Sequence, residues 1–206
     1  MRAATIDTNA SFSVLDLCAA PGGKSIYLKN LAPNANITAC DIHAHRTDLI
    51  RAYAKRMGVD IQVVINDACI YRESWMQKFD LVICDVPCSG IGVLSTRPDI
   101  ILNRTESSLL ALQELQKNIV IRAAQYVRPG GVLCYSTCTI LNEENQNVFS
   151  GLLREAPHMQ QIDLSALPIS AKLSTCGQVT RGKDIALLPD QNGFDGFYIA
   201  AARRTP

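Results

Sequence analysis

Residues 13–24 read Ser-Val-Leu-Asp-Leu-Cys-Ala-Ala-Pro-Gly-Gly-Lys, an apolar run that stops at a turn of small residues. Residues 13–18 do not alternate between polar and apolar side chains, so we predict a strand that is covered on both faces. A helix is predicted from Lys24 to Leu31, directly after the turn. A buried strand followed by a crossover helix is the unit from which parallel α/β sheets are built.

Similar units follow along the chain, and together they predict the fold class. Further buried strands are predicted at residues 36–41, 61–65, 79–85 and 132–136, helices at 46–57, 71–77 and 105–127, and a last strand at 196–202. Residues 164–192 are rich in Ser, Pro, Gly and Thr, so we expect loops there. Five strand–helix units predict a Rossmann-like, doubly wound and mostly parallel α/β sheet.

Length and composition restrict the class of protein. The chain has 206 residues, of which 48% are hydrophobic and 19% charged, and its net charge is +1. These values are typical of one globular domain and exclude a disordered chain. No apolar run approaches the roughly 20 residues of a membrane-spanning helix, and residues 1–7 lack the apolar core of a secretion signal. We therefore expect a cytoplasmic protein without membrane association, and the near-neutral charge gives no global argument for a polyanionic partner.

Eight cysteines are a high number for such a chain. Because there is no secretion signal and the chain is long enough to bury a core, we predict reduced thiols and not a disulfide framework. A zinc site is the alternative, since Cys84/Cys88 and Cys134/Cys138 both have Cys-x3-Cys spacing. Each pair straddles the end of a predicted strand, and no histidine lies near either pair in the sequence, so we expect no metal.

Acidic residues follow the predicted strands at the ends where α/β sheets bind ligands. Asp41, Asp67 and Asp85 follow the second, third and fourth strands. Asp41 comes about 20 residues after the first strand, where nucleoside-binding folds place a carboxylate for ribose hydroxyls. A single acid at such a position is often only a helix cap. Three acids at one edge of the sheet predict a nucleoside-binding site.

Two cysteines, Cys88 and Cys138, follow the fourth and fifth strands in loops of Gly, Ser and Thr. A single cysteine is usually inert packing. Burial does not explain thiols in polar loops, however, and their thiolates would be accessible. Asp85 lies three residues before Cys88. We therefore predict a nucleophilic thiol at this edge, and the residues alone leave open which cysteine attacks.

Several motifs resemble the signature motifs of one family. They are residues 18–24, residues 85–90 (Asp-Val-Pro-Cys-Ser-Gly), Ser-Thr-Cys-Thr at 136–139 followed by Glu-Glu-Asn at 143–145, Arg-Pro-Asp-Ile at 97–100 and Asp-Gly-Phe-Tyr at 195–198. Over residues 13–203 the chain is similar to the Sun/Fmu (RsmB-like) family of S-adenosylmethionine-dependent RNA cytosine-5 methyltransferases. The resemblance implies a class I methyltransferase fold with an antiparallel C-terminal strand.

The resemblance also implies the cofactor and the roles of the site residues. S-adenosylmethionine would bind with its ribose hydroxyls at Asp41 and its adenine beside Asp67, and Asp85 would lie between the cofactor and the target base. Cys138 matches the nucleophile of the family. Cys88 matches the second cysteine, which is associated with product release. The methionine part of the cofactor would be held by Cys18, Ala19, Ala20, Pro21, Gly22, Gly23 and Lys24.

The implied reaction transfers a methyl group to carbon 5 of cytosine in RNA through a covalent cysteine–base adduct. We expect ribosomal RNA, with a target cytosine that is single-stranded or flipped out of a helix. The family usually has an RNA-binding region before this core, whereas residues 1–206 are expected to form a single catalytic domain without it. RNA affinity would then come from such a region or from a partner. Val86 and Ile101 depart from the family pattern, in which relatives commonly have Ala and Lys.

Two other functions are weighed against this one. The first is an RNA- or cofactor-binding module without turnover, against which the intact Cys88, Cys138 and Asp85 argue. The second is a nicotinamide oxidoreductase, which the missing Gly-x-Gly-x-x-Gly fingerprint disfavours. Calorimetry with S-adenosylmethionine and with NAD would separate them.

The remaining charged residues receive simpler interpretations. Glu143 and Glu144 are expected to be first-turn charges on a helix. Arg97 and Arg104 flank the loop after the Cys88 motif, and we favour them for contacts with RNA phosphates. The basic residues on the helix after the second strand are expected to form a solvated face: Arg46, Arg51, Lys55 and Arg56.

Overall fold

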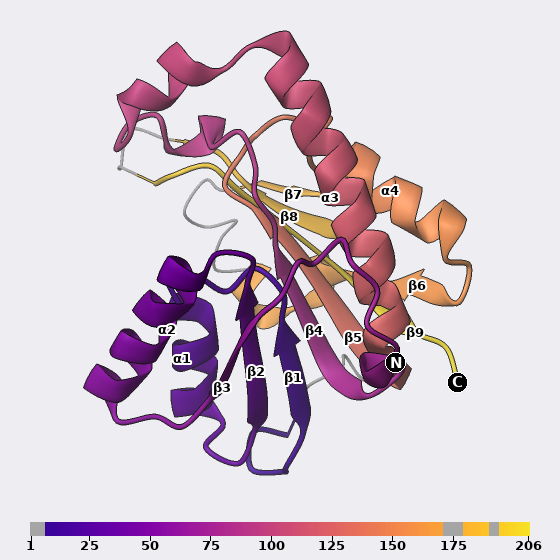
Figure 1. The fold of residues 1–206 in the computed structure, drawn as a ribbon. Coiled ribbons are helices and arrows are strands. Elements are labelled where there is room, and N and C mark those ends of the chain that lie inside the picture. The colour runs from indigo at the N-terminus through magenta and orange to yellow at the C-terminus, as the bar shows by residue number, and fades with distance from the viewer. Residues whose placement is uncertain (1–6, 171–178, 190–193) are drawn as a thin grey trace.

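The strands form one mixed sheet (Figure 1). The computed structural model describes residues 7–170, 179–189 and 194–206. In this part of the chain a nine-stranded sheet has the order β3-β2-β1-β4-β5-β9-β8-β7, with β6 paired to β9 beside that path. The strands are β1 (Ser13–Asp16), β2 (Asn36–Asp41), β3 (Gln62–Ile65), β4 (Phe79–Asp85), β5 (Val127–Thr137), β6 (Met159–Gln161), β7 (Val179–Arg181), β8 (Asp184–Leu187) and β9 (Phe197–Arg204).

The half of the sheet from β3 to β5 is parallel. Asp16 at the end of β1 pairs with Ile83 of β4, and Asp85 at the end of β4 pairs with Ser136 of β5. Because the five strands run in the same direction, their carboxyl ends lie at one edge of the sheet. The predicted Rossmann-like, mostly parallel sheet is confirmed.

The other half of the sheet is antiparallel. Strand β9 pairs antiparallel with β5 and β8, so the expected antiparallel C-terminal strand is confirmed. The expectation of loops throughout 164–192 is wrong for β7 and β8, which pair with each other at the sheet edge. These strands have three and four residues, and β8 pairs with β9 while β7 pairs with β8. Residues 171–178 and 190–193 of that stretch lie outside the described residues.

Helices cover both faces of the parallel half (Figure 1). Helices α1 (Gly23–Leu31) and α2 (Ala44–Met57) lie on one face, and α3 (Glu106–Tyr126) and α4 (Gln146–Glu155) lie on the other. A capping box begins α3, in which the Ser108 backbone N–H donates to Thr105 Oγ1 at 3.2 Å and the Thr105 N–H donates to Ser108 Oγ at 3.0 Å.

The short connecting segments are 3₁₀ turns. They are η1 (Glu73–Trp75), η2 (Ile91–Val93), η3 (Pro98–Asn103) and η4 (Leu164–Ala166). The helix expected at 71–77 is therefore wrong in type and length. Trp75 packs edge-on against Phe79 and Tyr126, with ring centroids 6.0 and 5.8 Å away. This packing turns the chain into β4 after a single turn.

The largest part of the core lies between the sheet and helices α3 and α4. Tyr135 of β5 is fully buried there, and its ring centroid is 6.1 Å from Phe149 of α4 and 6.3 Å from Tyr198 of β9. Aromatic side chains at such distances bury large areas and pack in few orientations. This aromatic packing holds the carboxyl end of β5 in place.

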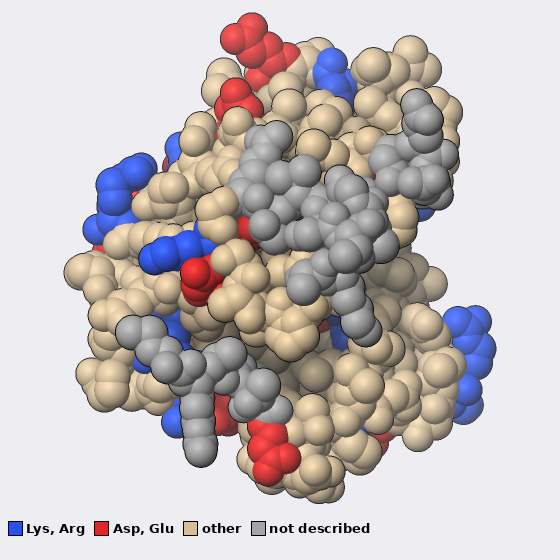
Figure 2. Space-filling model, turned by 180° about the vertical axis from the view of Figure 1, so that it is seen from behind, with Lys and Arg blue, Asp and Glu red and all other residues tan. Residues whose placement is uncertain are grey.

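The surface carries charges of both signs (Figure 2). On the face that Figure 2 shows, Lys and Arg side chains are interspersed with Asp and Glu, which agrees with the net charge of +1. Across the described ranges no helix combines the length and the apolar character that crossing a membrane requires.

Candidate active site

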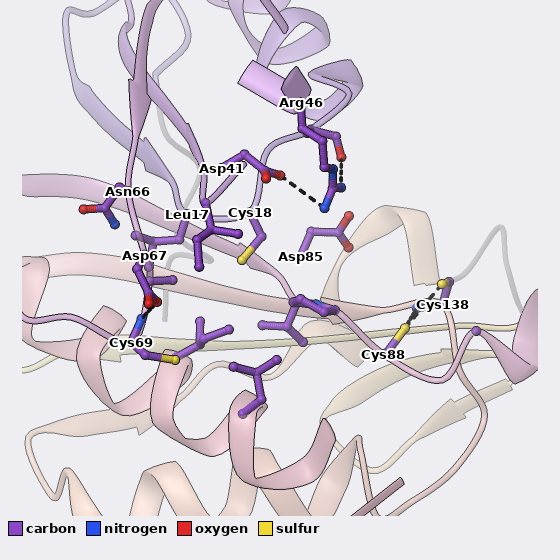
Figure 3. A pocket seen from close by; sticks show the side chains of 18 of the residues that line it. Leu17, Cys18, Asp41, Arg46, Asn66, Asp67, Cys69, Asp85, Cys88 and Cys138 are labelled. Carbon is purple, nitrogen blue, oxygen red and sulfur yellow. Dashed lines mark hydrogen bonds and ion pairs between the residues drawn. The ribbon is translucent and has the colours of Figure 1, made fainter. Parts of the chain in front are cut away.

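A cavity of about 550 Å³ opens at the carboxyl edge of the parallel strands (Figure 3). Its volume lies within the range of small-molecule sites in proteins, roughly 300–1,000 Å³. Seven residues of the predicted site line it: Cys18, Ala20, Asp41, Asp67, Asp85, Cys88 and Cys138. The sheet therefore brings together residues that lie up to 120 positions apart in the chain.

The other predicted cofactor residues do not line the cavity: Ala19, Pro21, Gly22, Gly23 and Lys24. They shape the turn between β1 and α1 instead. The Ala19 N–H donates to Cys40 O at 2.7 Å, which fixes the turn to β2. Gly22 has a φ of 106°, and a Cβ there would lie 3.2 Å from Cγ2 of Ile50. A left-handed backbone under a packed helix is a position that glycine alone fills easily.

Asp41 is held by two donors at the end of β2. Its Oδ1 accepts the His43 N–H at 3.0 Å, and its Oδ2 lies 3.4 Å from Nη1 of Arg46. Arg46 Nη2 also donates to Ala20 O at 3.1 Å. The interpretation of Arg46 as part of a solvated helix face is therefore wrong, because the first turn of α2 aims this side chain back over the cavity (Figure 3).

The end of β3 contributes two neighbouring polar side chains. Asp67 Oδ1 accepts the Cys69 N–H at 2.9 Å in a local turn. Asn66, which the sequence reasoning missed, also lines the cavity. Its Nδ2 is buried, and no hydrogen-bond partner for it occurs within the described ranges. The sequence feature that could have identified Asn66 was an amide side chain next to Asp67 at the end of a predicted strand.

Asp85 connects the cofactor turn to β5. Its Oδ2 accepts from Lys24 Nζ at 2.5 Å, and its Oδ1 accepts from Ser136 Oγ at 2.7 Å. Figure 3 shows Asp85 between the Asp41 side of the cavity and the pair of cysteines. Side-chain donors thus fix both carboxylate oxygens of Asp85.

Asp16 lies behind the same turn at the end of β1 and is fully buried. Its Oδ2 accepts from Ser25 Oγ at 2.7 Å, whereas its Oδ1 has no partner among the described residues. Burial raises the pKa of Asp16 from 3.8 to about 6, against the lowering effect of the Ser25 hydrogen bond.

The thiols of Cys88 and Cys138 are in direct contact, with the two Sγ atoms 3.3 Å apart. A hydrogen bond from the Cys88 thiol lowers the pKa of Cys138 to about 7. The same hydrogen bond, followed by burial, raises the pKa of Cys88. The Cys138 N–H also donates to Cys88 Sγ at 3.3 Å, and this hydrogen bond lowers the pKa of Cys88. The thiol contact and burial outweigh it, so Cys138 ionises more readily than Cys88.

The other cysteines differ in environment. All seven cysteines in the described ranges, Cys88 and Cys138 included, are free thiols. Burial raises the pKa of Cys40 to about 12 and raises that of Cys84 well above its ordinary value, so both are inert at neutral pH. Within the same ranges no cluster of three or more His, Cys, Asp or Glu residues has the arrangement of a metal site.

Two charged residues have roles that differ from those expected. Arg104 lines the cavity, but its Nε donates to Ser89 O at 2.8 Å and so supports the Cys88 loop. Glu144 is fully buried and precedes the helix that begins at Gln146, so its interpretation as a first-turn surface charge is wrong. The chain turns inward before α4, which spacing does not reveal. Arg97 lines the cavity and is exposed, and its contact with phosphate stays a prediction.

Comparison with known proteins gives one consistent family. The sequence model described as "16S rRNA methyltransferase RsmB/F" matches residues 3–203. Ribosomal RNA small subunit methyltransferase B of Shewanella oneidensis is 35% identical over 190 residues, which are 91% of this chain and 42% of that protein. The probable ribosomal RNA small subunit methyltransferase B of Bacillus subtilis is 35% identical over an alignment of 208 positions, which covers 98% of this chain and 45% of that protein. The chain thus spans less than half the length of these relatives.

A solved structure agrees with the sequence relatives. The crystal structure of NSun6 from Pyrococcus horikoshii with SFG has a TM-score of 0.76 to this chain at 27% identity. The match covers 96% of this chain and 49% of that one.

Proposed function

This chain belongs to the RsmB/F family of 16S rRNA methyltransferases, and from that membership we propose that it is the catalytic domain of an RNA cytosine-5 methyltransferase. The proposed substrate is a cytosine of small-subunit ribosomal RNA. One observation carries the chemistry: the sulfurs of Cys88 and Cys138 lie 3.3 Å apart and, together with Asp85, line one nucleoside-sized cavity.

S-adenosylmethionine is the cofactor. The related NSun6 structure contains SFG, an analogue of this molecule. The residues present fit it, because the cavity offers a carboxylate at Asp41 and a buried, unpartnered amide nitrogen at Asn66. We assign the ribose hydroxyls to Asp41, the neighbourhood of the adenine to Asn66 and Asp67, and the methionine part to the turn at 18–24. When bound, the cofactor supplies an electrophilic methyl group.

The side chains at the rim suit attack on an unreactive base. Carbon 5 of cytosine is a poor nucleophile until a thiolate adds to carbon 6. In the proposed reaction the C6–S bond forms from Cys138, and carbon 5 takes the methyl group from the sulfonium of the cofactor, which leaves as S-adenosylhomocysteine. The proton on carbon 5 is then lost to water. The C6–S bond then breaks, which restores the aromatic ring and the thiolate. Asp85, fixed by Lys24 and Ser136, is positioned to hydrogen-bond the edge of the base.

The two cysteines are assigned different tasks. Cys138 is the nucleophile in this proposal because it is the partner that holds negative charge at neutral pH. Cys88 keeps its proton, and we assign it to the release of the methylated base. The opposite pKa shifts of the two thiols support this division independently of the family motifs.

Trapping the covalent adduct tests the assignment. Each variant is incubated with labelled cytosine-containing RNA and S-adenosylmethionine and analysed by denaturing electrophoresis. Cys138→Ala should lose both methylation and adduct. Cys88→Ala removes the hydrogen bond that lowers the pKa of Cys138, so it should attack more slowly than the unmodified chain. Because release should be slowed as well, its adduct should still accumulate. Cys69→Ala is the matched control, because this thiol lines the cavity on the side of Asp67, away from Cys88 and Cys138 (Figure 3).

The opposite pattern would reverse the roles: an adduct that persists in Cys138→Ala and vanishes in Cys88→Ala. If the unmodified chain binds cofactor and RNA but bisulfite sequencing detects no 5-methylcytosine, the protein is a binding module and the proposal fails.

A further inference from the structure

The loop that carries Cys88 is held on both sides by one buried carboxyl group. Glu144 Oε1 accepts the Ser89 N–H at 2.8 Å and Nε2 of Gln116 at 2.8 Å. Gln116 Nε2 also donates to Pro87 O at 2.8 Å. Pro87 and Ser89 are the chain neighbours of Cys88. The backbone before and after Cys88 is therefore tied to Glu144, on one side directly and on the other through Gln116.

The loop that carries Cys138 is held in the same way by the next residue. Asn145 Oδ1 accepts from Thr137 Oγ1 at 2.6 Å, and Asn145 Nδ2 donates to Thr139 O at 3.0 Å. Thr137 and Thr139 are the chain neighbours of Cys138. Two consecutive residues therefore fix the flanks of two different cysteines.

Two further hydrogen bonds close this buried network. Ser89 Oγ donates to Thr139 Oγ1 at 2.8 Å, which joins the two cysteine loops directly. Tyr135 OH donates to the backbone carbonyl of Glu144 at 2.5 Å, which ties the Glu144–Asn145 segment to β5. The polar residues of the network are nearly or fully buried: Ser89, Gln116, Thr137, Thr139, Glu144 and Asn145. Hydrogen bonds shielded from water in this way hold geometry firmly.

We propose that Glu144 and Asn145 are positioning residues that set the contact between the sulfurs of Cys88 and Cys138. One rigid dipeptide holds both loops, so a change in either side chain shifts one sulfur relative to the other. Its catalytic meaning rests on the proposed function, in which this contact makes Cys138 a thiolate.

Stability alone accounts poorly for Glu144. Its Oε2 is buried, and no hydrogen-bond partner for it is found in the described structure. A buried carboxyl with an unsatisfied oxygen is a costly way to stabilise a core, because an apolar side chain of similar volume would serve at least as well. The position of Glu144 is explained by what its other oxygen holds.

The test measures the pKa of Cys138 without RNA or cofactor. The full chain is alkylated with iodoacetamide over a range of pH, and mass spectrometry follows the peptide that contains Cys138. In the unmodified chain we expect a midpoint at about 7. In Glu144→Ala the Cys88 donor is no longer held against Cys138, so the midpoint should rise to about 8.5, the value of a free thiol. The thiolate fraction at pH 7 would fall from about half to about 3%.

Three variants separate positioning from stability. Glu144→Gln keeps an acceptor for Ser89 and Gln116, so it should retain the midpoint near 7. Asp184→Ala removes another buried carboxyl, which accepts from Tyr198 OH and Gln161 Nε2 on the far side of β9. It should lower the melting temperature without moving the midpoint of Cys138. Where Glu144→Ala does not fold, Gln116→Ala removes the Pro87 support and one of the two donors to Glu144 Oε1, and it should shift the midpoint in the same direction.

The proposal is overturned if a folded Glu144→Ala or Gln116→Ala variant keeps the midpoint of the unmodified chain. It is also overturned if Asp184→Ala moves the midpoint equally, since the effect would then follow stability. The alkylation measurement uses no RNA, so it tests the positioning role separately from the proposed function. If the trapping experiment yields no cytosine adduct, the proposed function is rejected, and the midpoint of Cys138 still shows whether Glu144 sets the sulfur contact.

Discussion

Asp41 has acceptor capacity left after its contacts within the protein. The His43 N–H and the Arg46 guanidinium take one position on each carboxylate oxygen, and a carboxylate offers about four acceptor positions. Two hydroxyl groups of a ribose match the remaining positions. We therefore expect Asp41→Ala to weaken S-adenosylmethionine binding by about 1–3 kcal/mol, because buried donors are left unpaired. Isothermal titration calorimetry measures the effect as a change in dissociation constant.

Asp48→Ala is the matched control for this prediction. Asp48 lies on α2, and its carboxylate pairs with Arg51 at an exposed position. Its replacement should leave the dissociation constant unchanged. If Asp41→Ala also leaves it unchanged, the ribose hydroxyls are bound elsewhere.

The cysteine pair shows how contact distinguishes two identical groups. The sequence placed Cys88 and Cys138 at neighbouring strand ends but did not decide between them. The structure adds a sulfur–sulfur distance of 3.3 Å and unequal burial, which give the two thiols opposite pKa shifts. Such a division depends on ångström-scale placement, and spacing in the sequence does not encode it.

At the scale of elements, the turn from β1 to α1 contains a carboxyl group whose environment opposes ionisation. The pKa of Asp16 rises from 3.8 to about 6 through burial, so the folded chain binds the proton more tightly than the unfolded chain. The stabilising contribution is complete below about pH 3.8 and is lost as the pH rises through 6. Relative to the unmodified chain, Asp16→Asn should therefore gain about 3 kcal/mol of unfolding free energy between pH 3.5 and 7.5. Urea unfolding at several pH values measures this difference.

Asp80 at the start of β4 provides a control of opposite sign. Burial opposes its ionisation, but hydrogen bonds from Ser13 and Arg128 prevail and lower its pKa. Its stabilising contribution is present above the unfolded value and lost in acid, so Asp80→Asn should be most harmful at neutral pH. A stability difference for Asp16→Asn that does not vary with pH would show that Asp16 does not titrate as described.

The parallel elements were predictable, and the antiparallel ones mostly were not. Residues 36–41 and 79–85 form β2 and β4 with the predicted bounds, because unbroken apolar runs mark strands covered on both faces. Strands β6, β7 and β8 have only three or four residues, and their order comes from pairing with a neighbouring strand. Tertiary context of this kind leaves no periodic signal in so short a segment.

Across the whole molecule, the cavity is built by the meeting of five strand ends. The acids at 41, 67 and 85 were predictable because each ends a strand of the parallel half. Arg46, Asn66 and Glu144 were not, since their roles depend on which way a helix start or a loop turns in three dimensions. The strand pattern thus predicts where the site lies, while the packed structure determines which neighbouring side chains complete it.

The charge of the whole molecule predicts weak and weakly salt-dependent RNA binding by this chain. Its net charge is only +1. Of the arginines at the cavity, Arg46 pairs with Asp41 and Arg104 supports the Cys88 loop, whereas Arg97 is exposed and makes no ion pair within the described ranges. Each phosphate contact with single-stranded RNA contributes about 0.7 to the slope of log affinity against log salt concentration. About three contacts or fewer predict a slope no steeper than about 2.

Fluorescence anisotropy with a short cytosine-containing RNA between roughly 50 and 200 mM salt measures this slope. Arg97→Ala should reduce it by about 0.7, because one phosphate contact is lost. Arg51→Ala should leave it unchanged, since that guanidinium is bound to Asp48 on α2. A slope of about 5 or more would require a broad basic surface. A reduced affinity of Arg97→Ala at an unchanged slope would instead place Arg97 at the base and not at a phosphate, because contacts with bases release no counterions.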